Sequence, residues 1–286
     1  MEHHLDAPPL ATSPFEGQEK AMAKLIFTIL GCGSSGGVPR LGGLWGECDP
    51  DNPKNRRRRC SLLVERVTNS GTTRVLIDTS PDMRDQLLSE NVGTLDAVIY
   101  THGHADHVHG IDDLRMIVFN QKNRVAVWAD GPTQERLYGS FGYAFIQPEG
   151  SPYPPILDMY TIDGNVTISG AGGDITFKPF EVDHGAIDAL GFRIRDVAYL
   201  PDVASIPDSA WPFLEGLDVW IVDALRRTPH PTHAHLDRTL EWINKIQPKR
   251  AVLTNMHIDL DYETVDAETD DHVTPAYDGM KIEVDD

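Results

Sequence analysis

Short apolar runs separated by polar turns make up most of the first half of the chain from Lys24 onward. Runs of this length that are rich in Val, Ile and Leu are typical of β-strands with at least one buried face. They predict strands over 25–30, 60–65, 74–78 and 95–100. The turn residues 69–71 (Asn-Ser-Gly) predict a hairpin between the second and third strands, and residues 81–90 have a helical pattern.

The second half of the chain repeats this order of elements. Residues 190–195 and 197–200 predict a second hairpin, residues 207–214 a short helix, and residues 217–222 another buried strand. In both halves an aspartate follows the hairpin, and a histidine-bearing loop follows the later strand. We therefore expect an α/β fold in which two similar halves meet in one domain, with two sheets covered by helices.

Two stretches of the chain lack this pattern. Residues 1–22 have three prolines between positions 6 and 15 and no apolar period, so we expect a disordered N-terminal tail and one folded domain over 23–286. Translation from Met1 and translation from Met22 are both open interpretations. Residues 141–155, rich in aromatic residues, Pro and Gly, are expected to form an inserted loop that could cover a cleft.

Composition and charge narrow the classes of protein that remain. The 286 residues are 40% apolar and 24% charged, which is typical of a soluble globular protein. The sequence contains no apolar stretch of about 18 residues, no signal-peptide pattern and only three cysteines, so we expect a cytoplasmic protein without a membrane partner. The net charge of −19 repels a phosphate backbone and disfavours nucleic acid, but it leaves room for a small anionic substrate.

Metal-binding side chains are concentrated in the segment after the predicted strand 95–100, His102-Gly-His104-Ala-Asp106-His107. Imidazole and carboxylate groups are ligands of zinc and similar divalent ions. Alternate residues of an extended segment share a face, so His102 and His104 can bind one ion. Asp106 and His107 begin the next helix and can turn to a second ion. A solvated polar loop is the alternative, which this spacing disfavours.

The His-x-His-x-Asp-His pattern resembles the metallo-β-lactamase superfamily, and the resemblance covers nearly the whole chain from about Lys24. It implies an αβ/βα four-layer sandwich with metals at the edge between two sheets. It also implies that Asp78, at the end of the first hairpin, supports the metal-binding histidines from behind. Three later residues match the remaining metal ligands of the superfamily, namely His184, Asp202 and His257.

The resemblance therefore implies seven ligands for two divalent ions, Zn²⁺ or Mn²⁺. The ligands are His102, His104 and His184 for one ion, Asp106, His107 and His257 for the other, and Asp202 as the bridge between them. Two such ions lower the pKa of a shared water and hold phosphoryl oxygens during in-line attack. A complete set favours phosphodiester hydrolysis, although thiol-ester hydrolases of the superfamily share the same ligands.

Three further stretches, 31–39, 110–115 and 277–282, look like the branch that contains phosphoribosyl cyclic phosphodiesterases. In that branch a histidine lies at the active site, and the loop 232–236 (Thr-His-Ala-His-Leu) occupies its place here. His233 is the better match and His235 a near rival for the acid that protonates the leaving oxygen. A helix-entry loop with exposed histidines is the alternative. Asp106 is expected to orient the attacking hydroxide together with Asp202.

Two features bear on how far the resemblance extends. The cyclic phosphodiesterases carry a cysteine cluster for a structural zinc, whereas the corresponding stretch here supplies only Cys48, so we expect that zinc site to be absent. The basic run Arg56–Arg59 is expected to be a solvated strand end that pairs with acidic residues, and attraction of phosphate near the mouth of the site is the alternative.

These observations predict a phosphodiesterase that uses two metal ions and a metal-bound hydroxide to hydrolyse a small cyclic phosphate or a nucleotide-like phosphodiester. A nuclease of the tRNA 3′-processing type is the second enzyme hypothesis, against which the acidic net charge stands. A carrier like the B protein of pyrroloquinoline quinone synthesis is the non-enzymatic hypothesis, which a complete ligand set disfavours. The expected partner is a small phosphate ester, and a homodimer is one open assembly.

Overall fold

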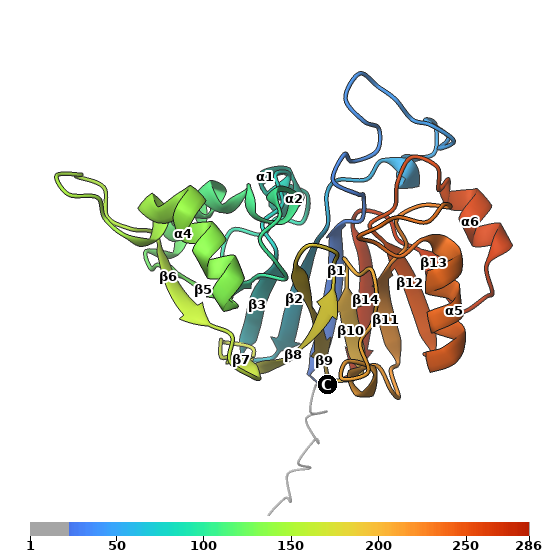
Figure 1. The fold of residues 1–286 in the computed structure, drawn as a ribbon. Coiled ribbons are helices and arrows are strands. Elements are labelled where there is room, and N and C mark those ends of the chain that lie inside the picture. Colours follow the sequence, from blue (N-terminus) through green and yellow to red (C-terminus); the bar gives the residue numbers. More distant parts are fainter. Residues whose placement is uncertain (1–22, 286) are drawn as a thin grey trace, which may run out of the picture.

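The computed structural model describes residues 23–285, so the tail expected over 1–22 lies outside the described residues. Within them the chain forms two mixed sheets of seven strands each (Figure 1). The first has the order β14-β1-β2-β3-β4-β5-β6, with β1 (Lys24–Gly31), β2 (Ser61–Thr68), β3 (Gly71–Ile77), β4 (Ala97–Ile99), β5 (Val125–Ala129), β6 (Leu157–Thr161) and β14 (Met280–Asp285). The second has the order β13-β12-β11-β10-β9-β8-β7, with β7 (Val166–Ile168), β8 (Ile175–Asp183), β9 (Asp188–Ile194), β10 (Val197–Leu200), β11 (Val219–Asp223), β12 (Arg250–Thr254) and β13 (Val273–Pro275).

Helices cover the outer faces of both sheets. The α-helices are α1 (Met83–Ser89), α2 (Ala105–Val108), α3 (Leu114–Gln121), α4 (Gly131–Phe145), α5 (Leu236–Ile246) and α6 (Tyr262–Glu268). Short 3₁₀ turns are η1 (Pro53–Asn55), η2 (Ile111–Asp113) and η3 (Trp211–Phe213). In Figure 1, α1, α2 and α4 lie on one side of the paired sheets and α5 and α6 on the other, which confirms the four-layer α/β sandwich. Among the helices of residues 23–285, none is long and apolar enough to cross a lipid bilayer.

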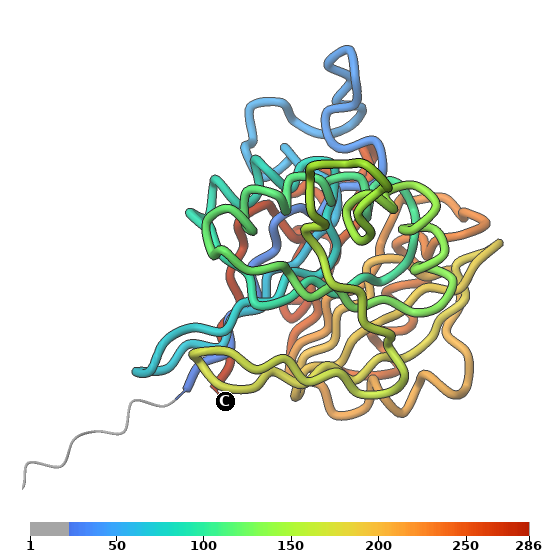
Figure 2. Tube along the Cα trace, turned by 90° about the vertical axis from the view of Figure 1, so that its left-hand side faces the viewer, coloured from blue at the N-terminus to red at the C-terminus, as the bar shows by residue number. Residues whose placement is uncertain are grey.

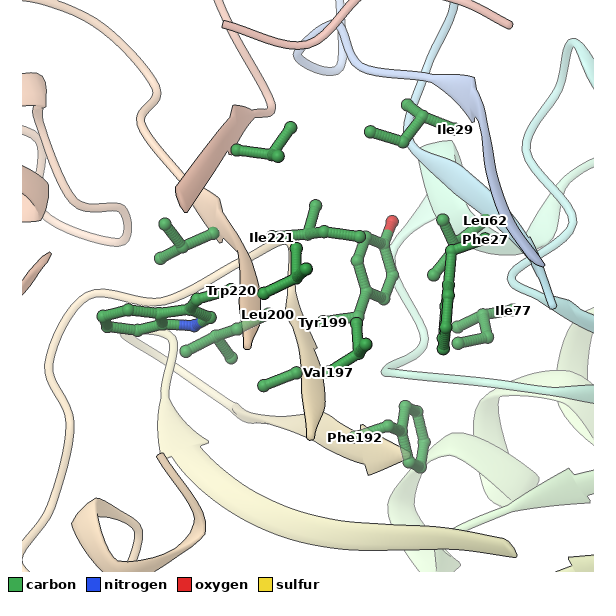
Figure 3. Packing of buried hydrophobic residues seen from close by; sticks show 14 of the residues in the cluster. Phe27, Ile29, Leu62, Ile77, Phe192, Val197, Tyr199, Leu200, Trp220 and Ile221 are labelled. Carbon is green, nitrogen blue, oxygen red and sulfur yellow. The ribbon is translucent and has the colours of Figure 1, made fainter. Parts of the chain in front are cut away.

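Alternation along the strands builds a separate core on each face of the first sheet. In β3, Ile77 points into the core between the sheets, and its neighbour Leu76 points toward the outer helices. Figure 3 shows Phe27 and Ile77 from the first sheet facing Phe192 and Tyr199 from the second. All of these side chains are buried, so the two sheets are held together by a continuous apolar layer.

The strand directions bring several loops to one edge. β3, β4 and β5 are parallel, as are β10, β11 and β12, so their carboxyl ends lie at the same edge of each sheet. β8 is antiparallel to β9, which is antiparallel to β10, so β8 also ends at this edge. A hydrogen bond from Leu190 N–H to the Thr101 carbonyl (2.9 Å) joins the two sheets there.

A long excursion between β1 and β2, residues 35–59, projects from this end of the molecule; we call it the arm (Figures 1 and 2). Its two legs pair where Val38 and Arg57 exchange backbone hydrogen bonds of 2.9 Å. Farther out, Glu47 N–H donates to the Ile258 carbonyl (2.8 Å). Gly46 adopts a φ of 62°, and a side chain there would overlap with that same carbonyl, so only glycine lets the arm dock this closely.

One element prediction was wrong and another was right only in part. A helix was expected over 207–214, but only η3 forms, because Pro212 lacks the N–H that a helix interior needs. The inserted loop expected over 141–155 is present at 146–155, whereas residues 141–145 belong to α4. Ala144 and Phe145 are buried against the outer core of the first sheet, and this packing outweighs the nearby glycines.

Candidate metal centre

Four predicted ligands meet at the edge where the two sheets join. His102 and His104 follow β4, His184 follows β8, and Asp202 follows β10. One ligand atom from each lies within 4.8 Å of all the others. His104 Nδ1 is 3.0 Å from His102 Nε2 and 3.1 Å from His184 Nε2. Asp202 Oδ2 is 3.5 Å from His102 Nε2 and 3.4 Å from His184 Nε2.

Hydrogen bonds to the far sides of two imidazoles set which nitrogen carries a proton. The Thr101 hydroxyl donates to Asp78 Oδ2 (2.8 Å), so it accepts from His102 Nδ1–H (2.9 Å). His184 Nδ1–H donates to the Thr232 carbonyl (2.7 Å). In both rings Nε2 is therefore left with a lone pair directed at the cluster.

The donor set fits a divalent cation. Burial lowers the pKa of His102 well below its ordinary value, and burial also lowers the pKa of His104 and of His184. Neutral imidazole is the form that binds metal. Neighbouring lone pairs and a buried carboxylate repel one another unless a cation lies between them, and three histidines with one aspartate form a suitable tetrahedral set.

His107 lies next to this group and opens toward a second position. Its Nδ1–H donates to Asp78 Oδ2 (2.8 Å), while its Nε2 is buried and has no hydrogen-bond partner. That Nε2 is 3.4 Å from Asp202 Oδ2 and 3.7 Å from Asp106 Oδ2. Burial lowers the pKa of His107, but Asp202, Asp78 and Asp106 outweigh burial and raise the pKa well above its ordinary value. The carboxylates of Asp202 and Asp106 thus favour positive charge at Nε2, which is a proton on the imidazolium or, once that proton is lost, a metal ion.

His257 lies outside the group of four, just beyond β12. Its Nδ1–H donates to Asp259 Oδ1 (3.1 Å), and its Nε2 contacts the guanidinium of Arg40 in the arm. Burial lowers the pKa of His257, and the positive charge of Arg40 lowers it further. Its Nε2 is thus an acceptor that faces a cation, which is the chemical state that a metal ligand needs.

The two candidate acids differ in their surroundings. His233 Nδ1–H donates to Asp223 Oδ2 (3.0 Å), and the His233 ring centroid is 4.7 Å from that of His184. Burial lowers the pKa of His233, but Asp223 outweighs it and raises the pKa to about 9. His233 therefore carries a proton at neutral pH beside the metal-binding side chains. His235 instead precedes α5 as its N-cap residue.

Two residues of the site were not predicted from the sequence. Asn255 donates to Asp202 Oδ1 and to Asp223 Oδ1, both at 3.2 Å, so it links Asp202 to Asp223, the hydrogen-bond partner of His233. Asn255 has a φ of 60°, a conformation that asparagine tolerates better than most residues. Asp223 is the last residue of the buried strand β11, and Asp78 directly follows β3. A carboxylate at the end of a buried strand could therefore have identified Asp223 as a site residue from the sequence. Asn255 had no comparable signal.

Residues 73–258 match the family described as the beta-lactamase superfamily domain. The chain belongs to this β-lactamase superfamily. A solved structure described as a new diphosphatase from the PhnP family is 35% identical, with a TM-score of 0.80 over 92% of this chain and 98% of the other. Zn²⁺-bound PqqB from Methylobacterium extorquens has a TM-score of 0.69 at 19% identity, over 91% of this chain and 100% of the other, and so supports the fold.

Two curated proteins that are similar to this chain are longer than the part that matches. An octanoyltransferase from Porphyromonas gingivalis is 32% identical over 262 residues, which are 90% of this chain and 51% of that protein. A ribonuclease Z from Bradyrhizobium is 39% identical over 149 residues, which are 49% of this chain and 45% of that protein. The chain thus spans about half the length of these relatives. Superfamily membership and the His/Asp group together support a metal-dependent hydrolase.

Proposed function

We propose that this chain is a phosphodiesterase that hydrolyses a small cyclic phosphate or a nucleotide-like phosphodiester. The observation that carries the proposal is the position of His233, a proton donor with a pKa of about 9, beside converging metal-binding side chains. Phosphodiester hydrolysis needs both an acid for the leaving oxygen and positive charge at the phosphate. The similarity to a protein described as a diphosphatase also supports phosphate-ester chemistry.

The proposal includes two divalent ions, Zn²⁺ or Mn²⁺. When bound, such ions lower the pKa of water and offset the charge on phosphoryl oxygens. The residues that would hold them are His102, His104 and His184 at the first position, Asp106, His107 and His257 at the second, and Asp202 at both. Asp106 and Asp202 would also orient the attacking water. Asp78 would keep His107 and, through Thr101, His102 in their binding orientation.

His233 would supply the proton that the leaving oxygen needs. Because Nδ1–H is donated to Asp223, the imidazolium holds its second proton at Nε2. Transfer of that proton to the ester oxygen as the P–O bond breaks leaves a neutral alcohol and a neutral imidazole. A positioned acid of this kind contributes roughly 10²–10⁴-fold in rate.

Competition kinetics test the substrate class. Purified protein loaded with Zn²⁺ or Mn²⁺ is given a 2′,3′-cyclic nucleotide and a precursor tRNA together. We expect hydrolysis of the cyclic phosphate and no productive cleavage of the RNA, because the net charge of −19 opposes contacts with many phosphates. Efficient trimming of the RNA with the cyclic phosphate untouched would overturn this proposal. No turnover of either substrate, or of bis-nitrophenyl phosphate, would favour a carrier.

Removal of the shared carboxylate tests the two-ion proposal. In Asp202→Ala we expect fewer than two ions per chain by elemental analysis after dialysis, because both positions lose a ligand. Glu215→Ala, in an exposed turn, is the control and should keep the wild-type metal content. Two ions still tightly bound in Asp202→Ala would show that this carboxylate is no bridge.

A further inference from the structure

The loop between β11 and α5 carries an imidazole that the proposed metal centre and the proposed acid leave unused. His230 lies three residues before His233, and their ring centroids are 5.2 Å apart. The His233 ring is in turn 4.7 Å from that of the metal-binding residue His184. His184 is buried, whereas His233 and His230 are half-buried, so a molecule that binds at the metal centre can also touch His230.

Thr232 sets the orientation and the tautomer of the His230 ring. The Thr232 backbone N–H and its hydroxyl lie 3.3 Å and 3.2 Å from His230 Nδ1. Because a backbone N–H can only donate, Nδ1 is an acceptor, and the neutral ring carries its proton at Nε2. Within residues 23–285, that Nε2–H has no hydrogen-bond partner. A ring held in one orientation thus presents an unused donor.

The loop that carries His230 is itself held in place at both ends. The Thr232 carbonyl accepts from His184 Nδ1–H (2.7 Å), which fixes the loop to the metal centre. On the other side of His230, the Arg226 guanidinium donates to the carbonyls of residues 228–229 at distances of 3.0 Å and 2.6 Å. His230 is therefore preorganised, which lowers the entropy cost of binding a ligand group.

The surroundings of His230 keep its imidazole neutral. Burial lowers the pKa of His230, and the positive charges of His233 and Arg226 lower it further. His184 and His257, one from each proposed metal position, act in the same direction. A half-buried ring that feels the charge of both positions lies at the mouth of the metal centre.

We propose that His230 is a specificity-determining residue that donates a hydrogen bond to a hydroxyl group of the substrate, close to the oxygen that leaves. The proposal rests on the proposed function, in which His233 protonates the leaving oxygen. Because His230 is the next ring outward from His233, its Nε2–H meets the organic group on that oxygen. A site built to hydrogen-bond a hydroxyl rejects an analogue that lacks it, because its own donor is then left unpaired.

Two cyclic phosphates that differ by a single hydroxyl test this role. Glycerol 1,2-cyclic phosphate carries the hydroxyl, propane-1,2-diol cyclic phosphate has a hydrogen in its place, and the scissile five-membered ring is the same. We expect wild-type kcat/KM to be about three- to tenfold higher for the glycerol compound, the effect of one net hydrogen bond.

Substitutions of His230 separate a substrate donor from a merely structural residue. His230→Asn should bring the ratio of the two kcat/KM values close to one, because its Oδ1 can still accept from Thr232 but no donor remains at the Nε2 position. His230→Gln places an amide N–H near that position and should restore part of the ratio. His272→Asn is the control and should keep the wild-type ratio, since His272 directly precedes β13, at the edge opposite the metal centre.

Calorimetry separates failure of this assignment from failure of the proposed function. Glycerol 1-phosphate and propane-1,2-diol 1-phosphate are titrated into Zn²⁺-loaded protein, an experiment that needs no turnover. We expect the glycerol compound to bind about three- to tenfold more tightly in wild type and in His272→Asn, and both compounds to bind equally in His230→Asn. This result without hydrolysis of either cyclic phosphate would keep the role of His230 and reject the phosphodiesterase. Hydrolysis of both cyclic phosphates at equal kcat/KM by wild type, or a preference that persists in His230→Asn, would reject the role of His230.

Discussion

Asp78 orients two histidines of the candidate metal centre through a single carboxylate. It is fully buried with a φ of 63°, and its carboxylate accepts from Thr101 N–H, the Thr101 hydroxyl and His107 Nδ1–H, each at 2.8 Å. Because the Thr101 hydroxyl also accepts from His102, a single carboxylate fixes a ring from each proposed metal position. Burial raises the pKa of Asp78, and these bonds oppose that rise by stabilising its ionised form.

The assignment of His233 predicts a dependence on the leaving group. His233→Ala should lower kcat by about 10²-fold or more for an alkyl phosphodiester, whose leaving oxygen needs a proton. The loss should be much smaller for a nitrophenyl ester, because nitrophenolate leaves without one. His235→Ala is the matched control, two residues away, and should affect both esters little. A leaving-group dependence in His235→Ala instead would transfer the role to that residue.

The sequence predicts side chains that are close along the chain better than those that the fold brings together. The segment 102–107 carries its ligands at alternate positions, so its chemistry is visible locally. Asn255 and Arg40 acquire their meaning only from contacts with Asp202 and His257, which lie 53 and 217 positions away. No local pattern in the sequence encodes such pairs. In the basic run 56–59, likewise, only the structure shows that Arg58 and Arg59 are the arginines that pair with carboxylates.

At the scale of elements, strands were predictable and helix limits were less so. The strands expected from the sequence were confirmed because short runs of buried apolar residues stand out along the chain, as at 217–222, where every residue of β11 is buried. Residues 141–145 have a composition typical of a loop but extend α4, because Phe145 finds an apolar neighbourhood supplied by other parts of the chain. The composition of one segment does not show which distant residues will pack against it.

The arm is held to α6 by a carboxylate, which predicts a dependence on acid. Asp261 accepts from Asn55 Nδ2 (2.6 Å) and Asp49 N–H (3.1 Å) in the arm and from Thr264 N–H (3.0 Å) in α6. Burial raises the pKa of Asp261, but these hydrogen bonds outweigh it and lower the pKa to about 2. The ionised form therefore stabilises the folded state fully above the ordinary carboxyl pKa of about 3.9, and this contribution is lost as the pH falls toward 2.

Asp261→Asn should lower the free energy of unfolding by about 1 kcal/mol at pH 7. The difference from wild type should shrink as the pH falls from about 4 to about 2, since the wild-type carboxyl then becomes neutral too. Urea unfolding at several pH values measures this. Asp266→Asn changes an exposed carboxylate of the same helix and should show neither effect. A difference that persists unchanged at low pH would contradict an electrostatic attachment of the arm.

At the scale of the whole molecule, stability depends on the apolar layer between the sheets. Phe192 is fully buried there (Figure 3). It packs edge-to-face on Phe177, with ring centroids 6.1 Å apart. Phe192→Ala should lower the free energy of unfolding by about 3–5 kcal/mol, because it removes a large buried side chain and leaves a cavity. Phe119→Ala, at a site that is 58% exposed, should change it by about 0.5 kcal/mol or less. Equal effects in chemical unfolding would show that the layer between the sheets is not the main core.

The position of β1 between β14 and β2 has a consequence for folding during synthesis. The partner of β1 on one side, β2, is complete once residues 61–68 are made, but its partner on the other side, β14, is not made until residues 280–285. More than two hundred residues are translated in that interval, which takes about ten seconds or more at about 5–20 residues per second. Throughout it, Leu25, Phe27 and Ile29 lie on a strand with free backbone donors and acceptors, a template for pairing between nascent chains. Chaperone demand should therefore peak just before β14 is made.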